Sequence, residues 1–278
     1  MTSHSSPIPA GEGLVFLKLG GSLITDKSRP HTHRPEVLAR LAGEIAAARE
    51  RFPGLHVILG HGSGSFGHVP ASRYGTRQGV RTAEEWAGFL EVRREAAALN
   101  QLVMAALEGA ALPALPFPPN ATVTASNGQV IAWDISPMEA ALQAGMLPVI
   151  YGDVIFDRAL GGTILSTEDL YYHLARLLRP DRLLLAGKEP GIWADYPACT
   201  QLIAEITPAD LPRLADTLGG SAETDVTGGM AAKVGVMFDL IRELPDLEAL
   251  VFSGEQPGNV ARALAGERVG TILHKHGA

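Results

Sequence analysis

Short apolar runs alternate with longer segments of helical periodicity along most of the chain. The runs that read as strands are Leu14–Leu19, Leu55–Leu59, Val130–Trp133, Pro148–Tyr151, Asp153–Phe156, Arg182–Ala186, Leu250–Phe252 and Thr271–Leu273. Such runs are typical of parallel strands that helices cover on both faces. The alternation therefore predicts an α/β fold with a mostly parallel central sheet.

Apolar residues spaced by three or four positions predict helices between these runs. The expected helices are Pro35–Arg51, Ala83–Gly109, Pro137–Ala144, Glu168–Leu178, Gly229–Leu244 and Asn259–Ala265. The second of them starts with Thr82-Ala-Glu-Glu85, a pattern typical of a capping box. Two segments break the alternation. Asp153–Phe156 and Gly162–Leu165 read as a hairpin, whereas Leu112–Asn120, with four prolines, reads as a rigid connection.

The composition is that of a large folded protein. The chain has 278 residues, 46% of them apolar, which suffices for one large α/β domain or two fused lobes. We expect a flexible tail at residues 1–13, an N-terminal lobe at 14–166 and a C-terminal lobe at 167–278. The tail lacks the basic start and apolar stretch of a signal peptide, and no apolar run reaches the roughly 20 residues of a membrane span.

The net charge and the cysteine content indicate which partners and which cell compartment to expect. The formal net charge is −7, so no basic face is expected that would neutralise the phosphates of a nucleic acid. The single cysteine, Cys199, excludes an intramolecular disulfide and fits a reducing cytoplasm. We therefore expect a cytoplasmic protein with neither nucleic acid nor membrane as a partner.

Two glycine loops carry the candidate chemistry. Lys18-Leu-Gly-Gly-Ser22 ends the first expected strand, and Gly60-His-Gly-Ser-Gly-Ser-Phe-Gly-His68 follows the second. Glycines let backbone N–H groups converge on an anion, and a helix N-terminus adds favourable partial charge. The first loop alone is equally consistent with a turn that needs glycine for steric reasons, but the second has more small residues than a turn requires. Together the loops predict a phosphate-handling enzyme.

A third segment supplies one more anion-facing helix start. Thr227-Gly-Gly-Met230 opens an expected helix that carries Lys233 one turn later. The chain has neither a Walker phosphate loop nor a dinucleotide fingerprint. Its histidines, cysteine and acids show no metal-ligand spacing, so no protein-held metal is expected, and His31 is expected on the surface of a polar loop.

Four segments together resemble the amino-acid kinase superfamily. They are Lys18-Leu-Gly-Gly-Ser-Leu-Ile-Thr-Asp-Lys27, the second glycine loop, Tyr151-Gly-Asp153 and Asp225-Val-Thr-Gly-Gly-Met-Ala-Ala-Lys233. Within the superfamily the chain is most similar to the isopentenyl phosphate kinases, and it shares the Phe-Gly-His ending of its second loop with the fosfomycin kinases. The resemblance implies a three-layer α/β/α sandwich of the carbamate kinase-like fold, an acceptor-binding N-terminal lobe, an ATP-binding C-terminal lobe and a homodimer.

The resemblance also implies roles for the cationic residues. Lys18 would contact the ATP phosphates, Lys27 would stabilise the transition state, and Lys233 would hold the phosphate tail of ATP, with Mg²⁺ carried by the nucleotide. The other nucleotide contacts would come from Gly20, Gly21, Ser22, Gly64, Lys188 and Gly228. A phosphate acceptor is already anionic at pH 7, so the reaction needs cations around the transferring phosphoryl group rather than a general base.

On the acceptor side, His68 would hydrogen-bond the acceptor phosphate, although a histidine at this place also suits a loop or a helix cap. Further acceptor contacts would come from Ser63, Gly64, Gly152 and Gly161. A five-carbon hydrocarbon tail needs an apolar pocket, and its burial contributes up to about 4 kcal/mol. Trp86, Phe89, Leu90 and either Ile155 or Ile164 are candidates for this pocket, but an apolar stripe at helical spacing is more often part of the core.

Two positions allow more than one interpretation. Asp169, in Ser166-Thr-Glu-Asp169, stands where the family has an acid that orients the active-site lysines, which implies a catalytic role. The same segment also suits a plain helix start. Gly187-Lys-Glu-Pro-Gly191 departs from the family's Thr-Asp-Val-Asp-Gly, so Lys188 either adds a cation near the ATP phosphates or is simply solvated.

The leading hypothesis is an ATP-dependent kinase that converts isopentenyl phosphate to isopentenyl diphosphate in isoprenoid synthesis. A fosfomycin-type kinase of a small phosphonate is the first alternative, and it would need a polar acceptor pocket. A non-catalytic nucleotide-binding sensor is the second, and it predicts nucleotide binding without turnover. Retention of Lys18, Lys27 and Lys233 argues against the sensor.

Overall fold

A central sheet runs through the whole molecule. The computed structural model describes residues 13–212, 214 and 229–275. Eight of the described strands form this sheet, in the order β12 (Glu205–Ile206), β14 (Gly270–Leu273), β13 (Glu248–Ser253), β9 (Arg182–Gly187), β1 (Leu14–Leu19), β2 (His56–His61), β6 (Leu147–Tyr151) and β3 (Ala114–Pro116). The strands from β13 to β3 are parallel, and β14 is antiparallel to β13. The expected mostly parallel sheet is confirmed.

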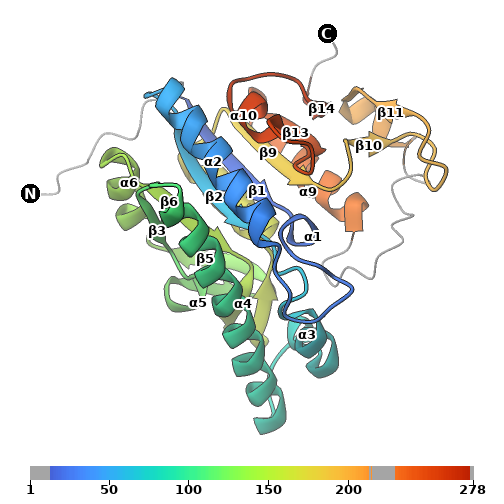
Figure 1. Ribbon diagram of the computed structural model, residues 1–278. Helices are drawn as coiled ribbons and strands as arrows, with labels where there is room; N and C mark the ends of the chain where they lie inside the picture. The colour runs from blue at the N-terminus through green and yellow to red at the C-terminus, as the bar shows by residue number, and fades with distance from the viewer. Residues whose placement is uncertain (1–12, 213, 215–228, 276–278) are drawn as a thin grey trace, which may run out of the picture.

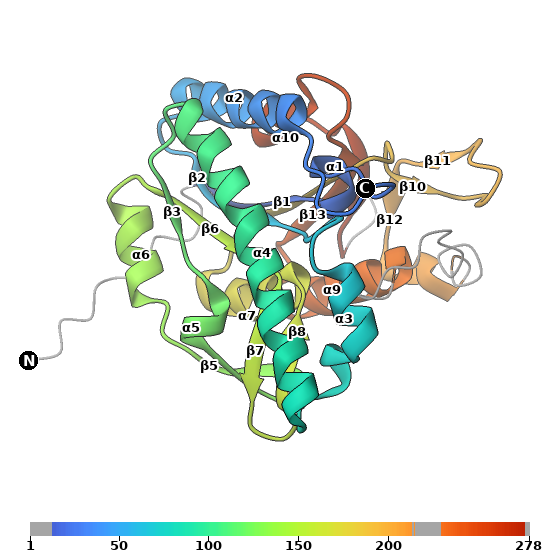
Figure 2. The same ribbon diagram turned by 60° about the horizontal axis from the view of Figure 1, so that its bottom comes forward.

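Helices cover both faces of this sheet (Figure 1 and Figure 2). One layer contains α2 (Pro35–Arg51), α4 (Ala83–Gly109) and α10 (Asn259–Leu264), and the other contains α6 (Ser136–Gln143), α7 (Thr167–Leu178) and α9 (Gly229–Glu243). Side chains of β1 alternate between the two cores: Val15 and Leu17 face the first layer, whereas Phe16 faces the second. The architecture is therefore the expected three-layer α/β/α sandwich.

A smaller sheet extends the molecule below the central one. It has the order β5 (Gln129–Trp133), β4 (Val123–Ser126), β7 (Asp153–Asp157) and β8 (Gly161–Leu165). The strands β7 and β8 form the expected antiparallel hairpin, and the N-terminal half of α4 packs on it (Figure 2). A second hairpin, β10 (Ile192–Trp193) with β11 (Leu202–Ile203), projects from the side of the molecule (Figure 1).

Several short elements were not expected. They are the helices α1 (Gly21–Ile24), α3 (His68–Tyr74) and α5 (Pro119–Thr122), the 3₁₀ turns η1 (Thr76–Gln78) and η2 (Pro208–Asp210), and the strands β4, β10, β11 and β12. The segment Leu112–Asn120 is not only a connection, because it contains the edge strand β3. Prolines are tolerated there because an edge strand need not donate every N–H group. Leu90 also departs from the expected apolar stripe of α4, since it is 55% exposed.

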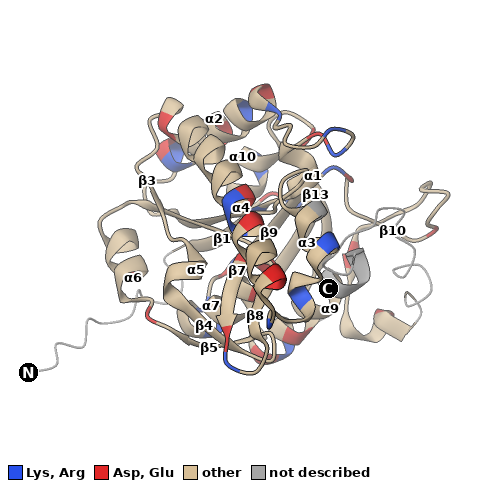
Figure 3. Cartoon of the chain, turned by 90° about the horizontal axis from the view of Figure 1, so that it is seen from below, with Lys and Arg blue, Asp and Glu red and all other residues tan. Residues whose placement is uncertain are grey.

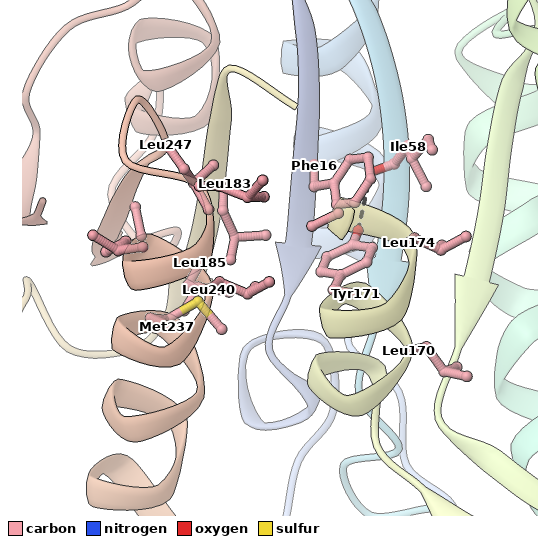
Figure 4. Packing of buried hydrophobic residues seen from close by; sticks show 14 of the residues in the cluster. Phe16, Ile58, Leu170, Tyr171, Leu174, Leu183, Leu185, Met237, Leu240 and Leu247 are labelled. Carbon is pink, nitrogen blue, oxygen red and sulfur yellow. Dashed lines mark hydrogen bonds between the residues drawn. The ribbon is translucent and has the colours of Figure 1, made fainter. Parts of the chain in front are cut away.

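Helix α7 is fixed to the centre of the sheet by one side chain. Tyr171 is fully buried, and its hydroxyl lies 2.8 Å from the carbonyl oxygen of Leu17 and 3.0 Å from that of Ile58 (Figure 4). A Cβ at Gly60 would lie 2.6 Å from this hydroxyl, so only glycine allows the helix to approach so closely. The start of α7 is thereby placed over the ends of β1 and β2.

Among the described residues, no helix is both long and apolar enough to cross a membrane.

Candidate active site

The two glycine loops lie at one edge of the central sheet. Parallel strands β1, β2, β9 and β13 all end at this edge, and Gly20, Gly62, Lys188 and Gly254 follow their last residues. In open α/β sheets, ligands bind outside the carboxyl ends of the strands. The predicted phosphate-binding segments therefore meet where the fold favours a site.

The glycines of the two loops are required by close packing. A Cβ at Gly21 would overlap the backbone nitrogen of Gly64, and a Cβ at Gly62 would lie 2.8 Å from the nitrogen of Gly21. Gly64 has φ +54°, and a Cβ there would lie 2.5 Å from the carbonyl oxygen of Gly21. The backbones of the two loops thus touch, as a phosphate-binding cradle requires. The N–H groups of Gly20 and Gly62 bond to Ala186 and Leu19, so these two donors serve the fold.

A hydrogen-bonded network joins the loops to the turn that carries Lys27. Thr25 Oγ1 donates to the carbonyl of Gly21 at 2.7 Å and accepts the N–H of Ser65 at 2.8 Å. Ser65 Oγ in turn lies 3.1 Å from both the nitrogen and the carbonyl oxygen of Thr32. Residues 26–33, which we call the Lys27 turn, are therefore attached to the second glycine loop.

Lys18 is buried at the centre of the site. Its side chain projects from β1 toward α7, and Nζ lies 2.9 Å from Glu168 Oε1. The two residues are 7% and 5% exposed. A buried ammonium needs a nearby carboxylate, because desolvation of an unpaired charge is costly. The ion pair therefore holds the Lys18 side chain in place at the end of β1, next to the glycine cradle.

Two adjacent acids at the start of α7 have different partners. The carboxylate paired with Lys18 belongs to Glu168, not to Asp169. Asp169 instead forms a capping box with Ser166, whose N–H and hydroxyl donate to Asp169 Oδ2 at 2.8 Å. The same oxygen lies 3.3 Å from Arg77 Nη2. The helix-start interpretation of Ser166–Asp169 is therefore confirmed, and a direct catalytic role of Asp169 stays a prediction.

Lys188 follows β9 on the side of the site away from the small sheet. Its carbonyl oxygen accepts the Ser253 hydroxyl at 2.7 Å, while its side chain is exposed. Hydrogen bonds from Ser28 lower the pKa of Asp26, and the charge of Lys188 contributes to this shift. The pKa of Glu255 is lowered mainly by its hydrogen bond with Arg34, with a further contribution from Lys188. Lys188 thus lies within electrostatic reach of the Lys27 turn.

Of the other residues predicted to bind the nucleotide, some are described by the structure and others are not. Ser22 lies in α1, directly after the glycine pair. The backbone of Lys233 lies in α9, but its side chain is outside the described residues, as is the whole of Gly228.

The residues predicted to bind the acceptor lie on the side of the glycine loops opposite to Lys188. Ser63 and Gly64 lie in the second loop, and His68 opens α3, although its side chain is not among those described. A Cβ at Gly152 would lie 3.3 Å from the nitrogen of Thr167, so Gly152 adjoins the start of α7. Gly161 has φ +78°, and a Cβ there would overlap the carbonyl oxygen of Val80. Packing alone therefore explains why position 161 is a glycine.

An apolar cluster lies behind the acceptor side. Phe89 is buried with Val80, Val92 and Val154, and Trp86 and Ile164 pack against them. The rings of Trp86, Phe89 and Phe156 lie within 6 Å of one another, with centroid separations of 5.1, 5.4 and 5.9 Å. Ile155, in contrast, faces the opposite core and does not join this cluster. Of the two isoleucines considered from the sequence, only Ile164 is in place.

Buried polar residues connect the site to the interior. His61, at the end of β2, is 1% exposed, stacks on Tyr151 and places Nε2 3.2 Å from Asn100 Oδ1. Burial lowers the pKa of His61, so the ring is neutral near pH 7. Burial also raises the pKa of Asp153 to about 7, although Asn120 donates a hydrogen bond to its carboxyl group. Asp153 is thus a buried acid at the start of β7.

Sequence reasoning missed Glu168, Thr25, Ser65 and Arg77. The first could have been found: once Asp169 is assigned to the capping box with Ser166, Glu168 is the acid left to face the strands. The other three act through contacts that no local pattern reveals. Within the described residues, no group of three or more histidines, cysteines or acids could hold a metal ion.

The geometry has the features of a phosphate-transfer site, and comparison with known proteins agrees. The model of the amino acid kinase family matches residues 13–253, so the chain belongs to this family and is a phosphotransferase. It is similar to the isopentenyl phosphate kinases of Haloferax volcanii (37% identity, 94% of this chain and 98% of the relative) and of Methanothermobacter thermautotrophicus (34%, 95% and 100%). The chain therefore belongs, within the family, to the isopentenyl phosphate kinase group.

Solved structures give the same result. A crystal structure described as isopentenyl phosphate kinase covers 94% of this chain and 99% of its own, with a TM-score of 0.78 and 29% identity. A substrate complex of isopentenyl phosphate kinase superposes with a TM-score of 0.74 at 23% identity, which supports the fold. The family resemblance and the fold predicted from the sequence are both confirmed.

Proposed function

We propose that the protein transfers the γ-phosphoryl group of ATP to the phosphate of isopentenyl phosphate, giving isopentenyl diphosphate and ADP for isoprenoid synthesis. The observation that carries the proposal is the buried Lys18–Glu168 pair beside two glycine loops in contact. This arrangement provides a fixed cation and converging backbone where two phosphates would meet. The isopentenyl phosphate kinases that match the chain over nearly its full length support the choice of acceptor.

The reaction would proceed without a general base. An oxygen of the acceptor phosphate, already ionised at pH 7, attacks the γ-phosphorus of ATP, and the bond to the β,γ-bridging oxygen breaks as ADP leaves. Lys18 and Lys27 would offset the repulsion between the two anions and stabilise charge on the transferring group. The residue that orients Lys18 would be Glu168. Mg²⁺ would enter with the nucleotide and supply a further positive charge.

The donor and acceptor would occupy opposite sides of the glycine cradle. On the donor side we assign Gly20, Gly21, Ser22, Gly64, Lys188, Gly228 and Lys233 to ATP. On the acceptor side we assign Ser63, Gly64, His68, Gly152 and Gly161 to the phosphate. The apolar cluster around Phe89 would receive the hydrocarbon tail, because burial of five carbons contributes up to about 4 kcal/mol.

Three coarser features complete the proposal. We assign acceptor binding to residues 14–166 and nucleotide binding to residues 167–278, which divide at the start of α7. A homodimer is proposed from the family resemblance, and a cytoplasmic location from the single cysteine.

The test is ADP release with Mg-ATP and a panel of acceptors: isopentenyl phosphate, dimethylallyl phosphate, fosfomycin, acetylglutamate and none. The proposal predicts a kcat/KM above about 10⁴ M⁻¹s⁻¹ for isopentenyl phosphate, alone or with its isomer. If fosfomycin were the only acceptor turned over, the acceptor would be a small phosphonate rather than isopentenyl phosphate. ATP binding without turnover of any acceptor would make the protein a sensor.

A further inference from the structure

His31, in the Lys27 turn, adopts an unusual backbone conformation. Its φ is +52°, a region that residues with a Cβ rarely enter. Backbone strain of this kind persists only where surrounding contacts enforce it, and it concentrates at functional sites. The backbone conformation of His31 therefore indicates that its contacts have a functional role.

Three contacts hold this residue in place. Its N–H donates to the carbonyl of Ser65 at 3.3 Å, and its ring meets Phe66 edge-to-face, with centroids 5.6 Å apart. Its Nδ1 lies 2.6 Å from Glu95 Oε2. Ser65 and Phe66 belong to the second glycine loop, and Glu95 belongs to α4. One side chain thus joins the Lys27 turn to two separate elements.

Glu95 lies at the acceptor side of the site. A Cβ at Gly67, the residue before α3, would lie 3.8 Å from Glu95 Cβ and 4.0 Å from Val92 Cγ1. Val92 is one of the residues packed with Phe89 in the apolar cluster. The helix face that carries Glu95 is therefore the wall between α3 and the proposed tail pocket.

The charge of Glu95 needs a partner at this place. Its Oε2 is shielded from solvent, and the contact with His31 becomes a hydrogen bond when Nδ1 carries a proton. An uncompensated carboxylate beside the start of α3 would repel an anionic acceptor. The hydrogen bond from Nδ1 to this carboxylate joins the turn to α4.

The other end of the turn is attached to the opposite side of the molecule. Arg34, which follows the turn, donates to Leu23 O at 2.9 Å and forms a two-pronged ion pair with Glu255, in the loop after β13. Lys27 thus lies on a segment that is anchored on the acceptor side by His31 and on the nucleotide side by Arg34.

We propose that His31 is a positioning residue that fixes the Lys27 turn to the acceptor wall through Glu95 and Phe66, so that Lys27 is held between the two substrates. The inference rests on the proposed function, because it assigns Lys27 to the transferring phosphoryl group. It explains why a strained residue stands within four positions of the proposed catalytic lysine.

The test compares three single variants with isopentenyl phosphate and Mg-ATP as substrates. His31→Asn tolerates a positive φ but lacks the imidazole, and Glu95→Gln keeps the shape of the acid without its charge. Both are expected to lower kcat by about 3- to 10-fold, since a displaced catalytic group costs rate, with the KM for ATP and the melting temperature unchanged. Glu91→Gln, one helical turn earlier on α4, is the matched control and should retain the wild-type kcat.

A second measurement separates positioning from any other effect. In the Lys27→Ala background, His31→Asn should lower kcat no further, because the residue acts only through Lys27. An undiminished kcat in both single variants, or an additive loss in the double variant, would overturn the inference. If wild-type protein turned over no isopentenyl phosphate, or if Lys27→Ala kept full activity, the proposed function itself would fail instead.

Discussion

Glu168 is the residue that holds Lys18 in place at the centre of the site. Its carboxylate is paired with Lys18 in a setting that is almost closed to solvent, and removal of one partner from a buried pair typically costs about 3–5 kcal/mol. We expect Glu168→Gln to lower the melting temperature and to reduce kcat by about 10- to 100-fold, because Lys18 loses the group that orients it. Thermal unfolding and steady-state kinetics measure the two effects.

Asp169→Asn is the informative comparison for that variant. It disturbs the capping box and the contact with Arg77, but it leaves the Lys18–Glu168 pair intact. A weakened cap costs about 1 kcal/mol. If Asp169→Asn lost more activity than Glu168→Gln, the assignment of the orienting acid to Glu168 would be wrong.

Asp153 predicts a pH dependence of stability. Burial raises its pKa to about 7 in the folded protein, above the ordinary value of 3.8. The folded state therefore binds the proton more tightly than the unfolded state, and this group makes the protein less stable as pH rises from about 4 to 7. A shift of about three pKa units corresponds to at most about 4 kcal/mol.

Asp153→Asn should remove this dependence. Asn120 can rotate its amide to pair with the new side chain, so the network is kept without a titrating group. We expect the melting temperature of the variant to exceed that of the wild type at pH 8, and the gain to shrink toward pH 5. Parallel pH profiles of the two proteins would contradict the assignment.

At the scale of elements, contact between the glycine loops makes a steric prediction. A methyl group at Gly64 would collide with Thr25 and with the carbonyl of Gly21, and the positive φ adds strain. We expect Gly64→Ala to abolish measurable turnover and to lower stability by more than about 1 kcal/mol. Gly43→Ala, on the exposed face of α2 with open space around it, should instead stabilise by about 1 kcal/mol. Equal effects in the two variants would refute the close-packing argument.

The elements also show what the sequence can predict and what it cannot. The bounds of α2 and α4 follow from the sequence, because long amphipathic segments repeat their pattern many times and a capping box marks the start of α4. Helices α1 and α3 are too short to show a period, and the prolines of β3 hide a strand that only its neighbour β6 defines.

The candidate active site also has residues that the sequence can predict and residues that it cannot. Lys18 and the glycine loops are visible in the sequence because backbone chemistry requires those residue types at those places. The partner of Lys18 is not visible in the same way, since Glu168 and Asp169 are adjacent acids whose directions depend on the cap. Contacts such as that between Ser65 and Thr32 join residues 33 positions apart, and only folding brings them together.

At the scale of the whole molecule, the two proposed lobes share one sheet. Strand β1 pairs with β2 on one side and with β9 on the other, so the sheet crosses residue 166 without a break. We expect one cooperative thermal transition, with far-ultraviolet circular dichroism and tryptophan fluorescence changing together. A non-hydrolysable ATP analogue should raise this single midpoint. Two separate transitions would show that the lobes are independent folding units.

Acidic and basic residues are interspersed along α4, as the cartoon coloured by charge in Figure 3 shows. With a formal net charge of −7, the protein as a whole does not attract two anionic substrates. The attraction must come from the few cations at the carboxyl edge of the sheet. The loss of any one of them should therefore strongly lower the activity of the enzyme.

The first turn of α7 has a practical consequence for anyone who recombines this protein with a relative. Thr167 donates its hydroxyl to the carbonyl of His61 at 2.6 Å, Glu168 holds Lys18, and Asp169 contacts Arg77. All three partners precede residue 166, so the turn belongs by its contacts to the half of the chain before it. A chimera joined at residue 166 would inherit mismatched partners, whereas a junction placed after Asp169 would keep these three side-chain contacts within one parent.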